Sequence, residues 1–133
     1  MNWFVLAAAI FAAITTLGHF IVGSKEYLSP LLNSSMEPVP KKVMQAVFHY
    51  VSVFLILSTL ALFAVALGHV PGDAGHYLVA FIAANYAFFA AWELAIAFTS
   101  GIKSAPIKMF HWTFFTIIAV LGAIGSCPCC CAG

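Results

Sequence analysis

The chain has 133 residues, of which 64% are hydrophobic and only 7% are charged, and its formal net charge is +1. A water-soluble domain carries about 25% charged residues, so this composition excludes a globular protein whose whole surface faces water. The small net charge and the lack of arginine argue against a nucleic-acid partner. We therefore expect the lipid bilayer to be the main solvent of one small domain.

Four apolar runs are each long enough to cross a membrane as a helix, which takes about 20 residues. They cover residues 2–23, 43–68, 77–99 and 107–126. The first run lacks the basic segment that opens a signal peptide, so we expect it to remain as a span. The sequence predicts an all-α fold, an integral membrane four-helix bundle that forms a single domain at 1–133 and ends in a Cys-rich tail at 127–133.

Each run has one face on which small or polar residues recur at helical spacing. Such faces favour contact with other helices over contact with lipid. The residues predicted to point inward are, run by run, Ala8, Ala12, Thr15, His19 and Gly23; Gln45, His49, Ser52, Ile56, Thr59 and Phe63; Asn85, Tyr86, Phe89 and Glu93; His111, Phe115, Ile118, Gly122 and Gly125.

Prolines mark two of the connections. Pro30, Pro38 and Pro40 predict that residues 24–42 interrupt the helical structure. Pro106 is well placed to be the first residue of the fourth helix, because proline fits the first helical turn.

The lysines predict the orientation in the membrane. All five lie in or beside the first and third connections, at Lys25, Lys41, Lys42, Lys103 and Lys108. By the positive-inside rule these connections face the cytoplasm. Both termini and the hairpin at residues 69–76 then lie on the outer side, which is the periplasm for a bacterial inner membrane.

Glu93 is the only acidic residue inside the four runs. A carboxylate in hydrocarbon is unfavourable by several kcal/mol unless it is paired, protonated or hydrated. The other three runs each hold one histidine, His19, His49 or His111. Counted from the ends of the runs, all four groups lie about 5 to 11 Å inside the cytoplasmic edge. We therefore expect them to form one polar layer.

Imidazole and carboxylate are ligands of zinc, iron and copper, so His19, His49, Glu93 and His111 are the first candidate for a metal site. Without metal the same groups suit a proton relay. Two facing histidines would instead hold haem iron, as in a small b-type cytochrome. Simpler alternatives remain open: a histidine that only bonds a neighbouring helix, and a protonated Glu93 that only packs.

The cysteines are confined to the C-terminal tail. The run Cys127-Pro128-Cys129 resembles the Cys-Pro-Cys motif of soft-metal transport ATPases, but the sequence contains neither their nucleotide-binding nor their phosphorylation domain. Thiolates suit soft ions such as Cu(I), so Cys127, Cys129, Cys130 and Cys131 are the second candidate metal site. Disulfides, acylation or no role at all are alternatives.

Short motifs at the ends of the runs support a family resemblance. They resemble small four-span bacterial inner-membrane proteins of no assigned activity, and the matching residues are His19, Gly23, Pro30, Leu31, Leu32, His49, Pro106 and Trp112. The resemblance implies the topology and no mechanism. No nucleophile–base pair, phosphate loop or dinucleotide fingerprint is present, which argues against a conventional soluble-type enzyme. A non-catalytic subunit of a larger membrane complex, or a homo-oligomer, is the remaining hypothesis.

Overall fold

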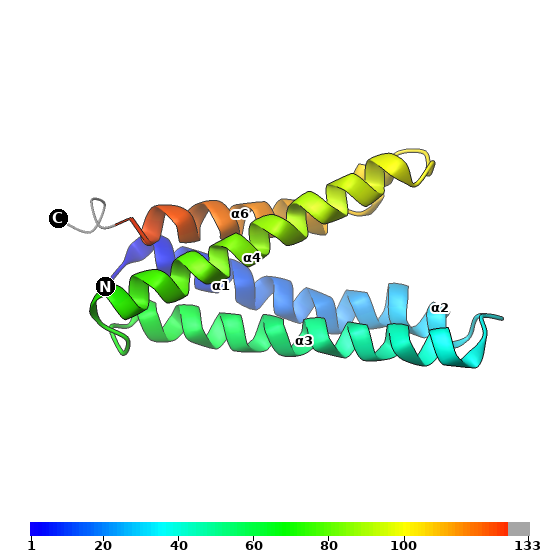
Figure 1. Cartoon of the computed structure of the whole chain (residues 1–133), viewed down its shortest axis with the longest axis horizontal. Coiled ribbons are helices and arrows are strands. Elements are labelled where there is room, and N and C mark those ends of the chain that lie inside the picture. Colours follow the sequence, from blue (N-terminus) through cyan, green and yellow to red (C-terminus); the bar gives the residue numbers. More distant parts are fainter. Residues whose placement is uncertain (128–133) are drawn as a thin grey trace.

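A computed structural model describes residues 1–127 of the chain (Figure 1). The helices are α1 (Trp3–Gly18), the π-helix η1 (His19–Leu28), α2 (Ser29–Leu32), α3 (Pro38–Ala66), α4 (Gly72–Thr99), α5 (Ala105–Lys108) and α6 (His111–Gly125). Three continuous stretches are apolar and long enough to cross a membrane, Trp3–Leu32, Pro38–Ala66 and Gly72–Thr99, and α6 is a shorter apolar helix. The predicted all-α membrane fold, compatible with a four-helix bundle, is confirmed.

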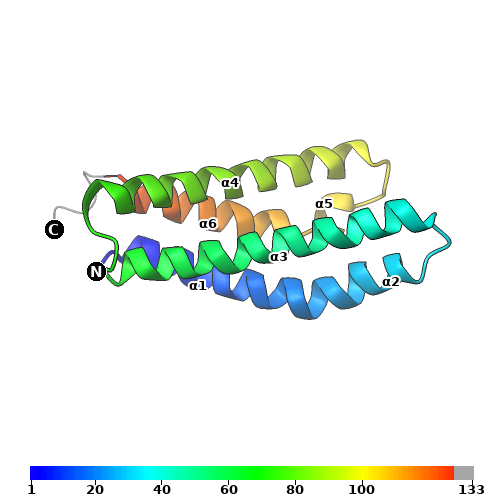
Figure 2. The ribbon, with the colours of Figure 1, turned by 60° about the horizontal axis from the view of Figure 1, so that its bottom comes forward.

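The helices associate as two pairs. The first pair is α1 with α3 and the second is α4 with α6, and contact between α1 and α6 joins the pairs (Figures 1 and 2). Although α3 and α4 follow each other in the chain, they contact each other only sparsely. The pairs lie together near the N-terminus and diverge toward the end that carries α2 (Figure 1).

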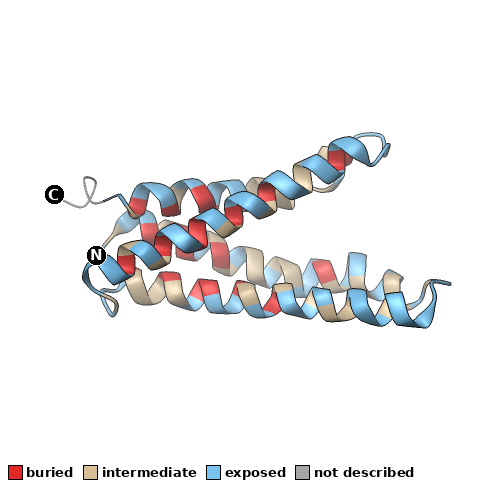
Figure 3. Cartoon of the chain, viewed as in Figure 1, coloured by how far each residue is buried: buried red, intermediate tan, exposed pale blue. Residues whose placement is uncertain are grey.

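The core lies in the half of the bundle nearer the N-terminus (Figure 3). It is built from the first half of α1 and α4 and the second half of α3 and α6, with Val5, Ala8, Ala9, Ala12, Leu55, Leu62, Ala66, Val79, Ile82, Tyr86, Ile118 and Ala119. Small residues let membrane helices approach closely. A Cβ on Gly125 would lie 2.6 Å from Cγ2 of Val5. At this point the backbone of α6 therefore packs directly against a side chain of α1.

Polar side chains bond across the same interfaces. The hydroxyl oxygens of Thr16 and Thr59 are 3.1 Å apart, which links α1 to α3. The Asn2 amide donates to the Gly125 carbonyl at 2.7 Å and links the start of α1 to the end of α6. These bonds add specificity to packing that consists mostly of alanine and aliphatic side chains.

The predicted inward faces hold for the first and fourth runs and need correction for the second. Ser52 and Thr59 are buried as expected, but His49 and Ile56 are exposed. The buried face of α3 also includes Ser58 and leucines 55 and 62. The polar residues of the second run did not predict its buried face correctly. The buried face of α3 is the one that packs mainly against α1.

The first helix is longer than predicted, since helical structure continues past Gly23 to Leu32. Pro30 does not interrupt it. It lies in the first turn of α2, where the missing N–H removes no α-helical bond, and Ser29 N–H pairs instead with the carbonyl of Ser24 in the π-helical pattern.

The fourth apolar helix, α6, begins at His111, later than predicted, and Pro106 belongs to the separate short helix α5. Residues Gly101 and Ser104 have left-handed backbone angles, with φ of 69° and 61°, and turn the chain between α4 and α5. With 15 residues, α6 is about 22 Å long, less than the ~30 Å of a bilayer's hydrocarbon core. Its length therefore leaves space beside η1 that a full-length fourth helix would fill.

Candidate functional site

Glu93 and His111 are in direct contact. Nδ1 of His111, the first residue of α6, lies 3.2 Å from Oε1 of Glu93 in α4. The His111 side chain is 30% exposed and the Glu93 side chain is 14% exposed. The acid within the apolar run thus has an imidazole partner, which reduces the unfavourable free energy of placing it in hydrocarbon.

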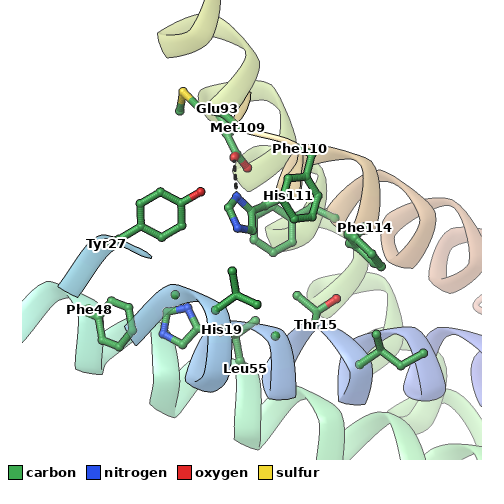
Figure 4. Close-up of a pocket in the computed structure, with 15 residues that line it drawn as sticks. Thr15, His19, Tyr27, Phe48, Leu55, Glu93, Met109, Phe110, His111 and Phe114 are labelled. Atoms are coloured by element: carbon green, nitrogen blue, oxygen red, sulfur yellow. Dashed lines mark hydrogen bonds and ion pairs between the residues drawn. The ribbon is translucent and has the colours of Figure 1, made fainter. Parts of the chain in front are cut away.

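A cavity of about 460 Å³ adjoins this pair (Figure 4). Its walls come from α1, η1, α3, α4 and α6, in the half of the bundle where the two helix pairs diverge. Its ionisable lining residues are His19, Tyr27, Glu93 and His111, and its phenylalanines are Phe48, Phe110, Phe114 and Phe115. The volume is within the range of small-molecule pockets, about 300–1,000 Å³.

His19 lines the cavity in a fixed orientation. Its Nε2 lies 3.0 Å from the Ser52 hydroxyl oxygen, and its ring stacks on Phe48 with 4.1 Å between centroids. A Cβ on Gly23 would lie 3.6 Å from Nδ1 of His19 and 3.4 Å from the Phe48 ring. Position 23 therefore lies in van der Waals contact with both stacked rings.

Tyr27 is a site residue that the sequence did not reveal. Its ring meets the His111 ring edge to face at 5.5 Å, and its hydroxyl is directed toward His111 (Figure 4). The predicted first span ended at Gly23, which left Tyr27 in the connection at residues 24–42. Continued helical structure is the signal that would have found it, because His19, Gly23 and Tyr27 recur every four residues and all line the cavity.

The π-helix η1 supplies these three residues. Long π-helical segments are rare, and π turns are frequent at functional sites. Here the ten residues His19–Leu28 carry the helix past the end of the tightly packed core. The unusual helix thus coincides with the wall of the cavity.

The start of α6 is held by local contacts. The indole N–H of Trp112 donates to the Pro106 carbonyl at 2.9 Å and ties α6 to α5. Phe110 stacks on His111 with 4.8 Å between ring centroids. These contacts fix the imidazole at the point where the helix begins.

His49 departs from the predicted arrangement. Its side chain is exposed, it does not line the cavity, and its ring contacts Phe48 edge to face. Of the four predicted ligands, Glu93 and His111 are in contact. His19 lines the same cavity, and His49 lies outside it. Within residues 1–127, no group of three His, Cys, Asp or Glu side chains is placed to hold a metal ion.

The second candidate metal site falls mostly beyond the described part of the chain. Cys127 is exposed. Cys129, Cys130 and Cys131 lie outside the described residues. Their predicted role as thiolate ligands stays a prediction.

Comparison of the chain with models of protein families, with curated proteins and with solved structures found no significant match. The resemblance to small four-span inner-membrane proteins therefore stays a prediction. What the chain does has to be inferred from the geometry of the cavity and of the Glu93–His111 pair.

Proposed function

We propose that this membrane protein carries an intramembrane acid–base site, in which Glu93 and His111 exchange a proton with molecules that reach the cavity. The observation that supports the proposal most strongly is the 3.2 Å contact between two ionisable side chains at the wall of an apolar cavity. Ionisable residues inside membrane spans are rare and commonly mark proton or substrate pathways.

The two groups divide the work. The hydrogen bond between Nδ1 and Glu93 sets the orientation of the imidazole ring. It leaves the other ring nitrogen of His111, Nε2, available to another partner. With one shared proton, the pair is neutral overall whether it is an ion pair or a neutral acid beside a neutral imidazole. A proton gained or lost at Nε2 therefore changes the hydrogen bond between Nδ1 and the Glu93 carboxyl group.

A transition metal such as zinc, iron or copper is a second candidate for this site. The Glu93–His111 pair would supply two of the donor atoms that such an ion needs. His19 lines the same cavity, but its Nε2 already bonds Ser52. The remaining donors would have to come from water or from a second copy of the chain, so the metal hypothesis has less geometric support than proton exchange.

Haem and a non-catalytic role remain as the other hypotheses. His19 and His111 are the histidines that line the cavity and would be the axial ligands of a b-type haem. A subunit of a larger complex or a homo-oligomer would instead use the apolar outer faces of the helices. Elemental analysis and a visible spectrum of the purified protein distinguish the metal, haem and metal-free forms directly.

The lysine distribution supports an orientation with the cavity in the cytoplasmic half of the membrane. Lys25, Lys41, Lys42, Lys103 and Lys108 all belong to the end of the bundle where the helix pairs diverge. In this orientation, which fits a bacterial inner membrane, the N-terminus is periplasmic and the acid–base site opens on the cytoplasmic side of the tightly packed core.

Nitrogen NMR of the imidazoles tests the acid–base site. In lipid nanodiscs, we expect the ring nitrogen signals of His111 to report a hydrogen bond between Nδ1 and Glu93. Glu93→Gln should change the tautomer of His111 and leave the signals of exposed His49 unchanged. A His111 ring that is insensitive to Glu93→Gln would contradict a shared acid–base site.

A further inference from the structure

Part of the cavity wall lies at the outer surface of the bundle. Four of its lining residues are substantially exposed on the outside of the bundle: Ile14 (48%), Val22 (40%), Tyr27 (45%) and Phe110 (44%). The first three belong to the stretch Trp3–Leu32, which is apolar and long enough to cross a membrane. In a bilayer, this arrangement would give a lipid-soluble molecule a sideways route to the cavity.

The walls are suited to a flat ring. Tyr27, Phe48, Phe110, Phe114 and Phe115 provide aromatic surfaces on several sides of the space (Figure 4). Aromatic rings bind other rings in offset-stacked or edge-to-face arrangements, which contribute beyond the area buried. Phe48 stacks on His19 and Phe110 stacks on His111, whereas Phe115 contacts Tyr86 and Phe89.

Three of the cavity's polar side chains lie at one end, and two others, His19 and Thr15, lie across the space from them (Figure 4). The carboxyl of Glu93, the imidazole of His111 and the hydroxyl of Tyr27 lie together, whereas Phe48 and Leu55 lie across the space (Figure 4). They offer both donors and acceptors of hydrogen bonds to a ligand oxygen. Ligand pockets of this kind use a few convergent polar groups to orient an otherwise apolar molecule.

Charge selects among lipid-soluble ligands. No lysine lines the cavity, and its one carboxyl group, Glu93, already has His111 as a partner. A charged group brought into such surroundings would lose its hydration without a counter-ion. The site therefore favours a neutral molecule over a fatty-acid anion or a lipophilic cation.

We propose that the cavity binds a neutral, lipid-soluble molecule whose planar ring carries hydrogen-bonding oxygens, of the quinone or quinol type, with a ring oxygen at His111 and Glu93. The assignment rests on the proposed acid–base site, because that pair supplies the hydrogen bonds to the ring oxygen. It concerns binding only and adds the class of ligand to that function.

Decylubiquinone is a suitable probe, added to the full-length protein in phosphatidylcholine nanodiscs. The variant Trp3→Phe/Trp92→Phe retains Trp112 as its single tryptophan, next to His111, and quinone binding quenches its fluorescence. We expect saturable quenching that weakens about tenfold or more in His111→Leu, which removes the hydrogen bond to the ring oxygen. His49→Leu, a matched change at an exposed histidine outside the cavity, should bind normally.

Gly18→Leu provides a second test that leaves the acid–base pair untouched. Gly18 lines the cavity, and a Cβ there would meet no atom within 4 Å, so a side chain at this position begins in open space. We expect this variant to keep its fold and lose saturable quenching.

Several results would overturn the assignment. Quenching that rises linearly with quinone and is the same in all variants would show partition into lipid alone, and saturable quenching that persists in Gly18→Leu would place the ligand elsewhere. Equal displacement by palmitate or tetraphenylphosphonium would contradict selection for a neutral ring. If His111 still responds to Glu93→Gln in the NMR experiment, any of these results rejects the ligand class and leaves the acid–base site standing.

Discussion

Glu93 and His111 are 18 positions apart in the sequence, yet Oε1 of the acid lies 3.2 Å from Nδ1 of the imidazole. The contact exists because α5 and its flanking turns, residues 100–110, return the chain from α4 to α6 and place His111 at a helix start beside α4. Glu93 and His111 thus come from α4 and α6, which pack on each other, and Tyr27 of η1 contacts the His111 ring.

The first prediction concerns the energy of this contact. Glu93→Leu and His111→Leu should have non-additive effects on the free energy of unfolding, because either change removes the same bond. A double-mutant cycle should give a coupling free energy of about 1 kcal/mol or more, which is typical of bonded pairs. Unfolding in mixed detergent micelles measures it, and additive effects of the two changes would show that the groups act independently.

The second prediction concerns the contact between α1 and α6. In Gly125→Ala the new methyl group would lie 2.6 Å from Cγ2 and 3.1 Å from the backbone nitrogen of Val5. Overpacking of this kind lowers the free energy of unfolding by about 1–3 kcal/mol. Gly18→Ala is the matched control, since its methyl group meets no atom within 4 Å and alanine favours helix. Equal stability of the two variants would mean that α6 does not approach α1 as described.

The third prediction concerns the buried pair Ser58 and Tyr86, whose oxygens are 2.9 Å apart. Tyr86 is fully buried. Tyr86→Phe should lower the free energy of unfolding by about 1 kcal/mol, because one hydrogen bond is lost. Ser58→Ala should have a larger effect, since it leaves a buried phenol without this partner.

Tyr50→Phe is the control for that pair, because Tyr50 is 70% exposed. It should leave stability nearly unchanged. If Tyr86→Phe were equally neutral, the phenol would not be bonded inside the core.

The fourth prediction concerns orientation. After the four native cysteines are replaced by serine, single cysteines at Ser35 and at Asp73 report on opposite ends of the bundle, since they lie in the connections after α2 and at the start of α4. A membrane-impermeant thiol reagent should label Asp73→Cys from outside intact bacterial cells and Ser35→Cys only in inverted vesicles. The reverse pattern would place the acid–base site in the outer half of the membrane.

The sequence predicted the class of fold because lipid imposes a strong constraint: backbone groups must be satisfied within each span, so long apolar runs become helices. It also identified the small-residue faces of the first and last runs, where Ala8, Ala12, Gly122 and Gly125 are buried. These features are local in the sequence, and helical periodicity is sufficient to find them.

The site was predicted only in part. Depth along each helix correctly suggested that Glu93 and His111 share a layer, but depth carries no information about rotation. His49 lies at the expected depth on the exposed side of α3. Tyr27 was missed because the π-helix could not be inferred, and a helix that continues through Pro30 contradicts the usual effect of proline.

Infrared difference spectroscopy of the Glu93 carboxyl group tests the acid–base site most directly. With the protein in nanodiscs and the pH stepped reversibly, the carboxylic C=O band that disappears in Glu93→Gln should be present, should exchange with deuterium, and should shift in His111→Leu. A band that does not shift in His111→Leu, or the absence of any Glu93-dependent band at all pH values, would contradict the claim that Glu93 and His111 share a proton.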